Sequence, residues 1–328
     1  MAVAYGIFSG GLDSLLAARL LMEQDVTVRL LTFTTPFFGA ERAVNSANGL
    51  GLAPEIIDLT EPHLEMLRNP KHGFGRFANP CLDCHALMFR HAGRIMARNG
   101  GDFLFSGEVL GQRPKSQNRR ALDIVARESG WEELILRPLS ALNLPPTRPE
   151  REGLVRRELL RGFSGRTRKP QMELAARFGL RDYPSPAGGC LLTDPGYSRR
   201  LKELIGRGLI VTAREARLLR VGRHFRLTGG SRLVVGRNQA ENEVIDRLFE
   251  SGDLMLKAIG LPGPQVLLSP PGSARPEHPD LDQAAVITAS YSDAVPGQTC
   301  RIEVLGRPEE VILTTRAVDK ENLAGLMI

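Results

Sequence analysis

A glycine-containing segment near the start of the chain restricts the possible folds more than any other feature. The apolar run Tyr5-Gly6-Ile7-Phe8 predicts the end of a short buried strand, and Leu15 to Met22 predicts a helix. Ser9-Gly10-Gly11-Leu12-Asp13-Ser14 lies between them. Glycines let the backbone approach a polyphosphate, and the free N–H groups at the start of a helix attract anions. We therefore expect a phosphate-binding loop here; the alternative is an ordinary tight strand-to-helix turn.

Alternation of strand-like and helix-like segments predicts an α/β fold with a doubly wound parallel sheet. The further expected elements are strands at 26–33, 55–59, 102–106 and 134–139, and helices at 41–49 and 82–98. In such sheets the crossovers are right-handed, and ligands bind beyond the carboxyl ends of the strands. The glycine loop and the loop after Ser106 should both open at that edge.

The 328 residues suggest two domains, and the texture of the sequence changes near residue 187. We expect a first domain at 1–186 and a smaller α+β domain at 187–328. In the second part, Asn238 and Glu241 predict a capped helix start, residues 301–313 predict a terminal hairpin, and Ser269 to Pro279 predicts a loop.

The composition is that of a globular protein, with a net charge of +6. No apolar run approaches the roughly 20 residues that a membrane span needs. The first residues lack the basic segment of a secretory signal. We expect a cytoplasmic protein with no membrane partner.

Basic residues are concentrated between Thr147 and Pro170, where eight Arg and Lys stand against three Glu. Clustering of this kind favours a polyanionic partner, although solvated helix faces are an alternative. The residues that we expect to bind an RNA backbone there are Arg148, Arg156, Arg157, Arg166, Arg168 and Lys169.

Three of the four cysteines stand in suggestive contexts. Cys81-Leu82-Asp83-Cys84-His85 begins the expected long helix, and Gly188-Gly189-Cys190 follows about a hundred residues later. A Cys-x-x-Cys pair in a reducing compartment favours metal binding or thiol chemistry, and a helix dipole stabilises thiolates at its N-terminus. Cys300 stands alone in the second domain and is expected to be structural.

The segment Ser9 to Ser14 resembles the PP-loop of ATP pyrophosphatases, which include GMP synthetase, NAD synthetase, and the tRNA thiolation and lysidine enzymes. The resemblance implies a HUP-like sheet that binds ATP and Mg²⁺. It also implies adenylation of a carbonyl oxygen with loss of pyrophosphate, after which a nucleophile displaces AMP. The loop would stabilise the negative charge that develops on the pyrophosphate leaving group. The expected nucleotide contacts are Phe8, Ser9, Gly10, Gly11, Asp13, Ser14, Gly107, Gln112 and Arg113.

Two residues of these loops have expected catalytic roles. Asp13 is expected to hold the magnesium ion, and Lys115 is expected to counter charge in the transition state. The alternative for the loop that contains Lys115 is a merely solvated segment.

Asn79-Pro80 with Cys84, and the later Gly-Gly-Cys, resemble the bacterial tRNA 2-thiouridine synthases. Those enzymes have an aspartate where this chain has Cys81. Three cysteines in this pattern are similar to the cluster-dependent tRNA thiolases, which implies a [4Fe–4S] cluster on Cys81, Cys84 and Cys190 with one iron open for sulfide. The alternatives are a persulfide or disulfide pair of Cys84 and Cys190, zinc with His85 as a fourth ligand, and inert core thiols.

The stretch from Val234 to Glu243 resembles the NFACT-R domain, an RNA-binding module, and the similarity extends over about 225–268. It implies that Arg237 and Asn238 reach RNA. The alternative for Asn238 is a helix cap.

Together these features predict an ATP-dependent tRNA sulfurtransferase with Asp13, Lys115, Cys84 and Cys190 as its catalytic residues. Its partners would be tRNA and a sulfur donor, either sulfide or a persulfide derived from a cysteine desulfurase. Two other classes remain open. One is a PP-loop ligase or amide synthase for a small molecule, and the other is a non-catalytic RNA-binding protein.

Overall fold

The chain forms two compact units, Met1–Asp194 and Pro195–Ile328. The computed structural model describes residues 1–180, 183, 189–271 and 278–328, and only the backbone of 278 and 279. The predicted boundary between residues 186 and 187 lies outside the described residues, as does most of the predicted loop at 269–279. None of the described helices combines the length and the apolar character that crossing a membrane requires.

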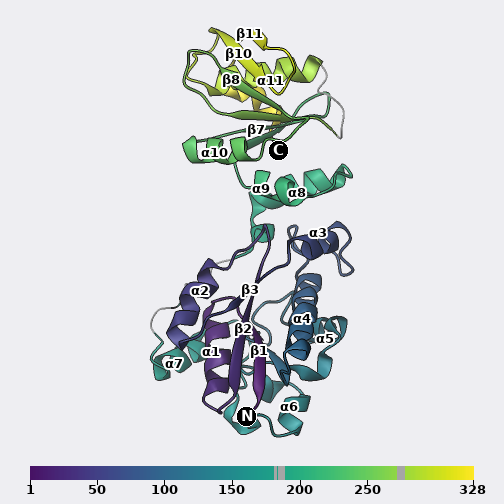
Figure 1. Ribbon diagram of the computed structural model, residues 1–328, viewed down its shortest axis with the longest axis vertical. Coiled ribbons are helices and arrows are strands. Elements are labelled where there is room, and N and C mark those ends of the chain that lie inside the picture. Colours follow the sequence, from purple (N-terminus) through teal and green to yellow (C-terminus); the bar gives the residue numbers. More distant parts are fainter. Residues whose placement is uncertain (181–182, 184–188, 272–277) are drawn as a thin grey trace. The chain divides into compact units, whose positions relative to one another are not determined.

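The first unit is built on a five-stranded sheet with the order β3-β2-β1-β4-β5, and every neighbouring pair is parallel (Figure 1). The strands are β1 (Val3–Ile7), β2 (Thr27–Thr34), β3 (Glu55–Asp58), β4 (Phe103–Ser106) and β5 (Ile135–Leu136). The predicted α/β class and parallel sheet are confirmed. The strand order changes direction between β1 and β4, so their carboxyl ends form the switch point at which such sheets bind ligands.

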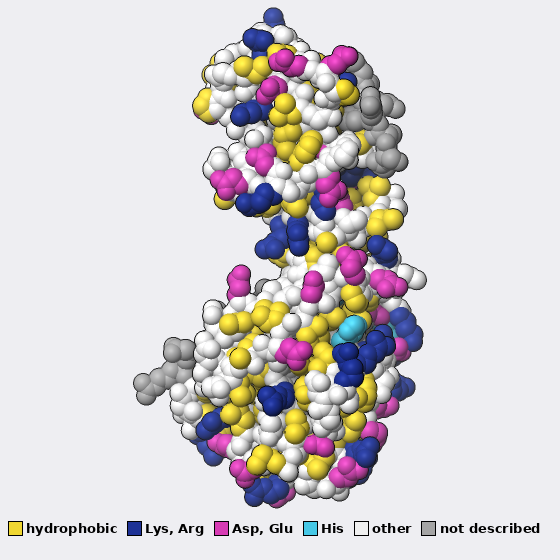
Figure 2. All heavy atoms as spheres, viewed as in Figure 1, with side chains coloured by type: hydrophobic (Ala, Val, Ile, Leu, Met, Phe, Trp, Pro, Cys, Tyr) yellow, Lys and Arg dark blue, Asp and Glu magenta, His cyan; other side chains and the backbone are white. Residues whose placement is uncertain are grey.

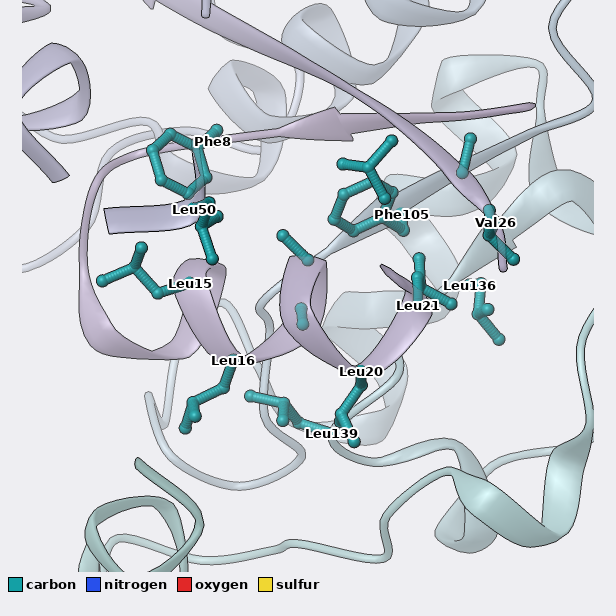
Figure 3. Close-up of a cluster of buried hydrophobic side chains, with 14 of the residues drawn as sticks. Phe8, Leu15, Leu16, Leu20, Leu21, Val26, Leu50, Phe105, Leu136 and Leu139 are labelled. Carbon is teal, nitrogen blue, oxygen red and sulfur yellow. The ribbon is translucent and has the colours of Figure 1, made fainter. Parts of the chain in front are cut away.

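Helices cover both faces of this sheet. They are α1 (Leu12–Met22), α2 (Glu41–Ala47), α3 (Thr60–Arg68), α4 (Cys81–Arg98), α5 (Arg119–Ser129), α6 (Arg148–Arg151) and α7 (Lys169–Arg177). Successive residues of a strand point to opposite faces, so Leu30 belongs to the hydrophobic cluster around α1 and Leu31 to the cluster beneath α4. Figure 3 shows the first of these clusters, in which the leucines of α1 pack with Phe8 and Phe105.

The second unit contains a six-stranded antiparallel sheet with the order β11-β10-β8-β9-β7-β6. Its strands are β6 (Arg223–Arg226), β7 (Arg232–Val235), β8 (Leu254–Ala258), β9 (Val266–Ser269), β10 (Thr299–Leu305) and β11 (Val311–Arg316). Its helices are α8 (Pro195–Gly206), α9 (Ala213–Leu218), α10 (Gln239–Arg247) and α11 (His278–Tyr291). The sheet packs on α11 through one hydrophobic cluster and on α9 and α10 through a smaller one. The predicted terminal hairpin is confirmed, because β10 pairs with β11.

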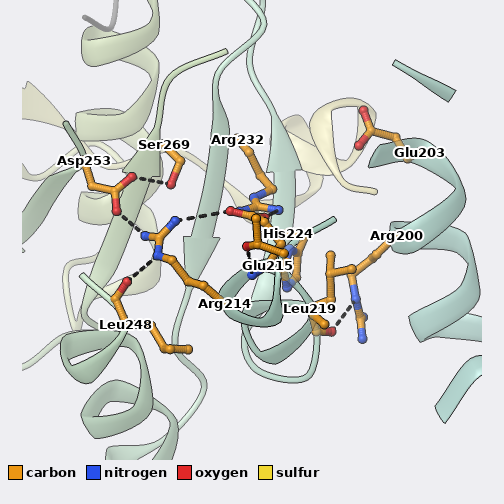
Figure 4. A network of polar contacts seen from close by, with 12 residues as sticks. Arg200, Glu203, Arg214, Glu215, Leu219, His224, Arg232, Leu248, Asp253 and Ser269 are labelled. Carbon is orange, nitrogen blue, oxygen red and sulfur yellow. Dashed lines mark hydrogen bonds and ion pairs between the residues drawn. The ribbon is translucent and has the colours of Figure 1, made fainter. Parts of the chain in front are cut away.

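A network of charged side chains ties the elements of the second unit together (Figure 4). Arg214 of α9 forms an ion pair with Asp253, whose Oδ1 accepts a hydrogen bond of 2.7 Å from Ser269 Oγ. The adjacent Glu215 forms an ion pair with the buried Arg232 of β7. Arg214 and Arg232 thus each have a carboxylate partner, and neither positive charge is left uncompensated inside the unit.

His224 of β6 gives the second unit a defined acid sensitivity. Burial, together with the nearby Arg232 and Arg200, lowers the pKa of His224 to about 3. The pKa of His224 in the folded chain lies below the ordinary 6.5 of an unfolded chain. The buried neutral ring therefore contributes fully to stability above pH 6.5, and this contribution is lost as the pH falls toward 3. We expect the protection of β6 and β7 amides against hydrogen exchange to fall about tenfold per pH unit below pH 6. A His224→Gln variant should show a flatter profile, and an equal slope in both proteins would contradict this assignment.

Candidate active site

The loop after β1 is fixed by the helix that follows β2. Gly10 has a φ of +71°, and a Cβ at this position would lie 2.5 Å from the carbonyl oxygen of Arg42. The carbonyl oxygen of Gly10 accepts a hydrogen bond of 2.8 Å from Ser46 Oγ. After Gly11, α1 begins without a side-chain cap. Its first N–H groups are therefore available to an anion, as the sequence pattern predicts for a phosphate loop.

The side chains of the predicted loop have different local surroundings. Ser9 is exposed, whereas Ser14 Oγ donates a hydrogen bond of 2.8 Å to the carbonyl oxygen of Gly11. Phe8 is buried in the core, and its carbonyl oxygen accepts a hydrogen bond of 2.8 Å from Thr32 Oγ1. Phe8 thus anchors the loop, and Ser9 is the loop hydroxyl that faces solvent.

The loop after β4 lies against the first turn of α1. A Cβ at Gly107 would lie 2.5 Å from the backbone of Asp13 and Ser14, so a glycine is required for this approach. Gln112 Nε2 donates a hydrogen bond of 2.8 Å to Asp13 Oδ2, and Gln171 Nε2 donates one of 3.1 Å to Gln112 Oε1. Asp13 Oδ1 is buried and has no hydrogen-bond partner among the described residues. A carboxylate oxygen in this state suits a magnesium ion, which prefers oxygen ligands.

Three of the four cysteines are near neighbours in space. Cys81 and Cys84 lie in the first turn of α4. The Leu191 N–H donates a hydrogen bond of 3.0 Å to the carbonyl oxygen of Phe37, which ties the segment of Cys190 to the end of β2. Cys190 and Cys81 both act electrostatically on Cys84. The thiols therefore meet although about a hundred residues separate them in sequence.

The surroundings of Cys84 and Cys190 favour the protonated form of both thiols. Burial raises the pKa of Cys84 well above its ordinary value, and Cys190 and Cys81 raise it further. Burial also raises the pKa of Cys190 to about 11, although the Leu192 backbone and Arg113 act in the opposite direction. The prediction that the start of α4 stabilises a thiolate is wrong for Cys84, because burial outweighs the helix dipole there.

One loop connects the phosphate loop with the thiols. Gln112 bonds to Asp13, and the next residue, Arg113, lies close enough to Cys190 to lower the pKa of its thiol. Asp13 and Cys190 therefore lie at the same end of the first unit. Arg113 and Lys115 are both exposed on this loop.

The thiols form no ready-made metal site. Among the described residues, no group of three or more His, Cys, Asp or Glu side chains is arranged to hold a metal ion. In type and number, Cys81, Cys84 and Cys190 match the soft ligands of an iron–sulfur cluster. In the structure the three residues lie near one another as free thiols.

A buried charge pair that the sequence analysis missed lies beside the thiols. Glu108 is 6% exposed, its Oε1 lies 2.8 Å from His85 Nδ1, and its Oε2 accepts a hydrogen bond of 2.9 Å from Arg137 Nε. Burial by itself would raise the pKa of Glu108, but Arg137 and His85 outweigh burial and lower the pKa to about 2. The ionised carboxylate orients the ring of His85, the residue after Cys84. Glu108 lies two residues after β4 and Arg137 directly follows the neighbouring β5, and this position was the signal that could have revealed them.

The basic stretch between residues 147 and 170 is partly neutralised by acids. The ion pairs are Arg148–Glu152 at 2.7 Å, Arg151–Glu133, Arg157–Glu150, and Lys169–Glu173 at 4.0 Å. In the part of the chain that the structure describes, no acid pairs with Arg156, Arg166 or Arg168. The positive charge that this stretch offers to a polyanion is thus smaller than its composition suggests.

The two predicted RNA contacts of the second unit also have local partners. Arg237, whose side chain is 49% exposed, forms an ion pair with Glu241. Asn238 Oδ1 accepts a hydrogen bond of 3.0 Å from the N–H of Glu241. The capping role that the sequence pattern allowed for Asn238 is confirmed.

Comparison with known proteins identifies one domain. Residues 222–326, less than half of the chain, match the NFACT protein RNA binding domain. No curated protein matches the chain.

Two solved structures resemble the chain only loosely. The C-terminal part of the fibronectin/fibrinogen-binding protein from Streptococcus suis has 15% identity and a TM-score of 0.29, over 40% of this chain and 67% of that one. The predicted subunit of a tRNA methyltransferase from Methanocaldococcus jannaschii has 16% identity and a TM-score of 0.39, over 66% of this chain and 91% of that one. At these scores nothing that those proteins do is carried over to this chain.

The buried pair of Glu108 and Arg137 should contribute strongly to stability. Glu108→Gln leaves the guanidinium of Arg137 buried without a carboxylate, and we expect a loss of about 3–5 kcal/mol in the free energy of unfolding, measured by urea denaturation. Glu133 pairs with Arg151 at the surface, where both side chains are more than half exposed. The matched Glu133→Gln variant should therefore lose less than about 1 kcal/mol. Similar losses in the two variants would contradict the role of burial.

The raised pKa of Cys190 predicts slow alkylation in the reduced, metal-free protein. At pH 8 its thiolate fraction should be about 100-fold lower than in the urea-unfolded chain, because the pKa is raised from 9.0 to about 11. Mass spectrometry of iodoacetamide-treated peptides measures the rate at this residue. A rate at pH 8 equal to that of the unfolded chain would show that burial does not control this thiol.

Proposed function

We propose that the chain is an ATP-dependent tRNA sulfurtransferase. A carbonyl oxygen of a nucleobase attacks the α-phosphorus of ATP, and pyrophosphate leaves. Hydrosulfide, or an equivalent donor, then attacks the activated carbon, AMP leaves with the oxygen, and a proton is released. The product is a thiocarbonyl base, and no net oxidation or reduction is needed when sulfide is the donor.

The observation that carries this proposal is the position of the loop from Gly107 to Lys115, which contacts both the phosphate loop and the thiol of Cys190. Gln112 bonds to Asp13 at 2.8 Å beside the uncapped start of α1, and Arg113 interacts with the thiol of Cys190. In the proposed mechanism the N–H groups of α1 bind pyrophosphate, and Asp13 Oδ1 binds the accompanying Mg²⁺. Arg113 and Lys115 would balance charge that develops on the phosphates.

The sulfur would be carried at the thiols. Cys81, Cys84 and Cys190 are the residues that would hold a [4Fe–4S] cluster, and such a cluster would supply an open iron position for sulfide. Burial raises the pKa of Cys84 and Cys190, so each of these two thiols would release a proton on becoming a ligand. The competing form of the proposal uses Cys84 and Cys190 as a persulfide pair.

The match of residues 222–326 to an RNA-binding domain supports RNA as the substrate. Arg156, Arg166 and Arg168 in the first unit would add contacts to phosphates, because they have no acidic partner among the described residues. A base must leave its stack to enter the site, so we expect a loop nucleotide of tRNA to be the target.

The test is product analysis with anaerobically purified protein, ATP, labelled sulfide and tRNA. We expect AMP and pyrophosphate to form together with labelled tRNA, and Asp13→Asn to slow AMP formation at least ~100-fold through loss of the metal ligand. The matched control is Asp123→Asn on α5, which removes an exposed carboxylate and should leave the rate unchanged. Iron and acid-labile sulfide should be present in the wild type and reduced in Cys81→Ala.

Each other outcome identifies a different function. AMP formation that depends on a small molecule and not on tRNA would indicate a PP-loop ligase. ATP and RNA binding without AMP release would indicate a non-catalytic RNA-binding protein. Sulfur transfer by an iron-free wild type from a persulfide donor in place of sulfide would favour the persulfide pair. In that route the outer sulfur of a Cys84 persulfide bonds to the activated carbon as AMP leaves, Cys190 releases the thiocarbonyl base by forming a disulfide with Cys84, and an added thiol reduces that disulfide.

A further inference from the structure

A groove on the first unit lies outside the candidate active site. It has a volume of about 590 Å³, and it is lined by Ile57, His91, Arg94, Ile95, Ala97, Arg98 and Trp131. We call it the Trp131 groove. Its size lies in the range of sites that bind small molecules or single groups of a larger ligand.

The Trp131 groove combines an apolar floor with uncompensated positive charge. Among the described residues, neither Arg94 nor Arg98 forms an ion pair, and Arg98 Nε donates only to the carbonyl oxygen of Arg94, at 3.3 Å. Burial lowers the pKa of His91, and Arg94 and Arg90 lower it further, which shows that the positive field acts inside the groove. In Figure 2, dark-blue and cyan side chains gather over α4 next to yellow ones. A ligand that complements this surface carries a negative charge and a flat apolar group.

The indole of Trp131 is held in place before any ligand binds. A Cβ at Gly93 would lie 2.1 Å from Trp131 Nε1, so the ring lies directly on the backbone of α4. The backbone N–H of Trp131 also donates a hydrogen bond of 3.1 Å to Ser129 Oγ. An aromatic ring that is already ordered loses little entropy when a base stacks on it.

The groove and the thiols lie along the same helix. Positions 84, 91 and 98 of α4 are seven residues apart and therefore share one face. Cys84 and Arg98 are separated by fourteen positions, or about 21 Å along the helix axis. A polymer with several repeating negative charges can span this distance, whereas a free mononucleotide cannot.

We propose that the Trp131 groove binds a nucleotide of the RNA substrate that lies several positions from the target nucleotide. Its base stacks on Trp131, and its phosphates contact Arg94 and Arg98. This inference rests on the proposed function for the identity of the substrate, but it concerns binding and not the sulfur chemistry.

The chain has a single tryptophan, so its fluorescence reports on the groove alone. We expect titration of the full chain with tRNA to quench this fluorescence. The double variant Arg94→Gln/Arg98→Gln should bind tRNA roughly tenfold or more weakly, and its salt dependence should fall by about two phosphate contacts.

The matched control is Arg29→Gln/Arg68→Gln, which removes two exposed arginines elsewhere on the first unit. It should keep the affinity, the quenching and the salt dependence of the wild type. Circular dichroism of both double variants verifies that they are folded.

The outcomes separate this inference from the proposed function. If tRNA binds but leaves the fluorescence unchanged, and the two double variants bind equally, the inference is overturned even where tRNA is thiolated. Quenching by AMP that equals quenching by tRNA would also overturn it, because a free nucleotide would then be the occupant. Loss of affinity only in the groove variant supports the inference even if no sulfur enters the RNA, in which case the proposed function alone fails.

Discussion

The close approach of Gly107 to the first turn of α1 determines the geometry of the whole site. Because a Cβ would lie 2.5 Å from the Asp13 and Ser14 backbone, the loops after β1 and β4 meet without side chains between them. This contact lets Gln112 reach one oxygen of Asp13 and leaves the other without a partner among the described residues. It also brings Arg113 to Cys190. A side chain at position 107 would separate the phosphate loop from the thiols, so a single small residue joins the two halves of the proposed chemistry.

Much of this arrangement could be predicted from the sequence. Alternating apolar runs indicated the parallel strands, and the carboxyl-end rule placed the loops after Phe8 and Ser106 at one edge. The fifth strand was predicted at 134–139, but β5 contains only Ile135 and Leu136. The reason lies in Pro138, which has no N–H for the ladder, and in the turn that follows, where the Ser140 N–H donates a hydrogen bond of 2.9 Å to the carbonyl oxygen of Arg137. Arg137 itself is buried against Glu108. A local sequence pattern shows that a residue is charged, but it does not show which partner will be buried with it.

Charge was the property that sequence predicted least well. Eight basic residues between 147 and 170 suggested a strong anion-binding surface, yet Glu150 pairs with Arg157 and its Oε2 also accepts hydrogen bonds from Thr147. Arg237 shows the same effect, because it forms an ion pair with Glu241 four residues along the chain. Conversely, His91, Arg94 and Arg98 stand within eight residues of one another, but only the helix shows that they line one groove with Trp131. A count of charges along the chain therefore misjudges both surfaces, because pairing and helical spacing decide which charges remain available.

The thiols show how two physical effects compete at one position. The dipole of α4 favours a thiolate at its N-terminus by a fraction of a pKa unit to about one unit. Burial acts in the opposite direction and is stronger, and each neighbouring sulfur that ionises makes the next ionisation harder. Cys190 and Cys81 raise the pKa of Cys84, so ionisation there needs a compensating cation, and Arg113 supplies one positive charge beside Cys190. The metal centre proposed at these thiols would bring positive charge together with deprotonation, whereas ATP and RNA are anionic and would oppose it. The electrostatics around Cys84 and Cys190 thus support a mechanism in which binding of such a centre precedes activation of the thiols.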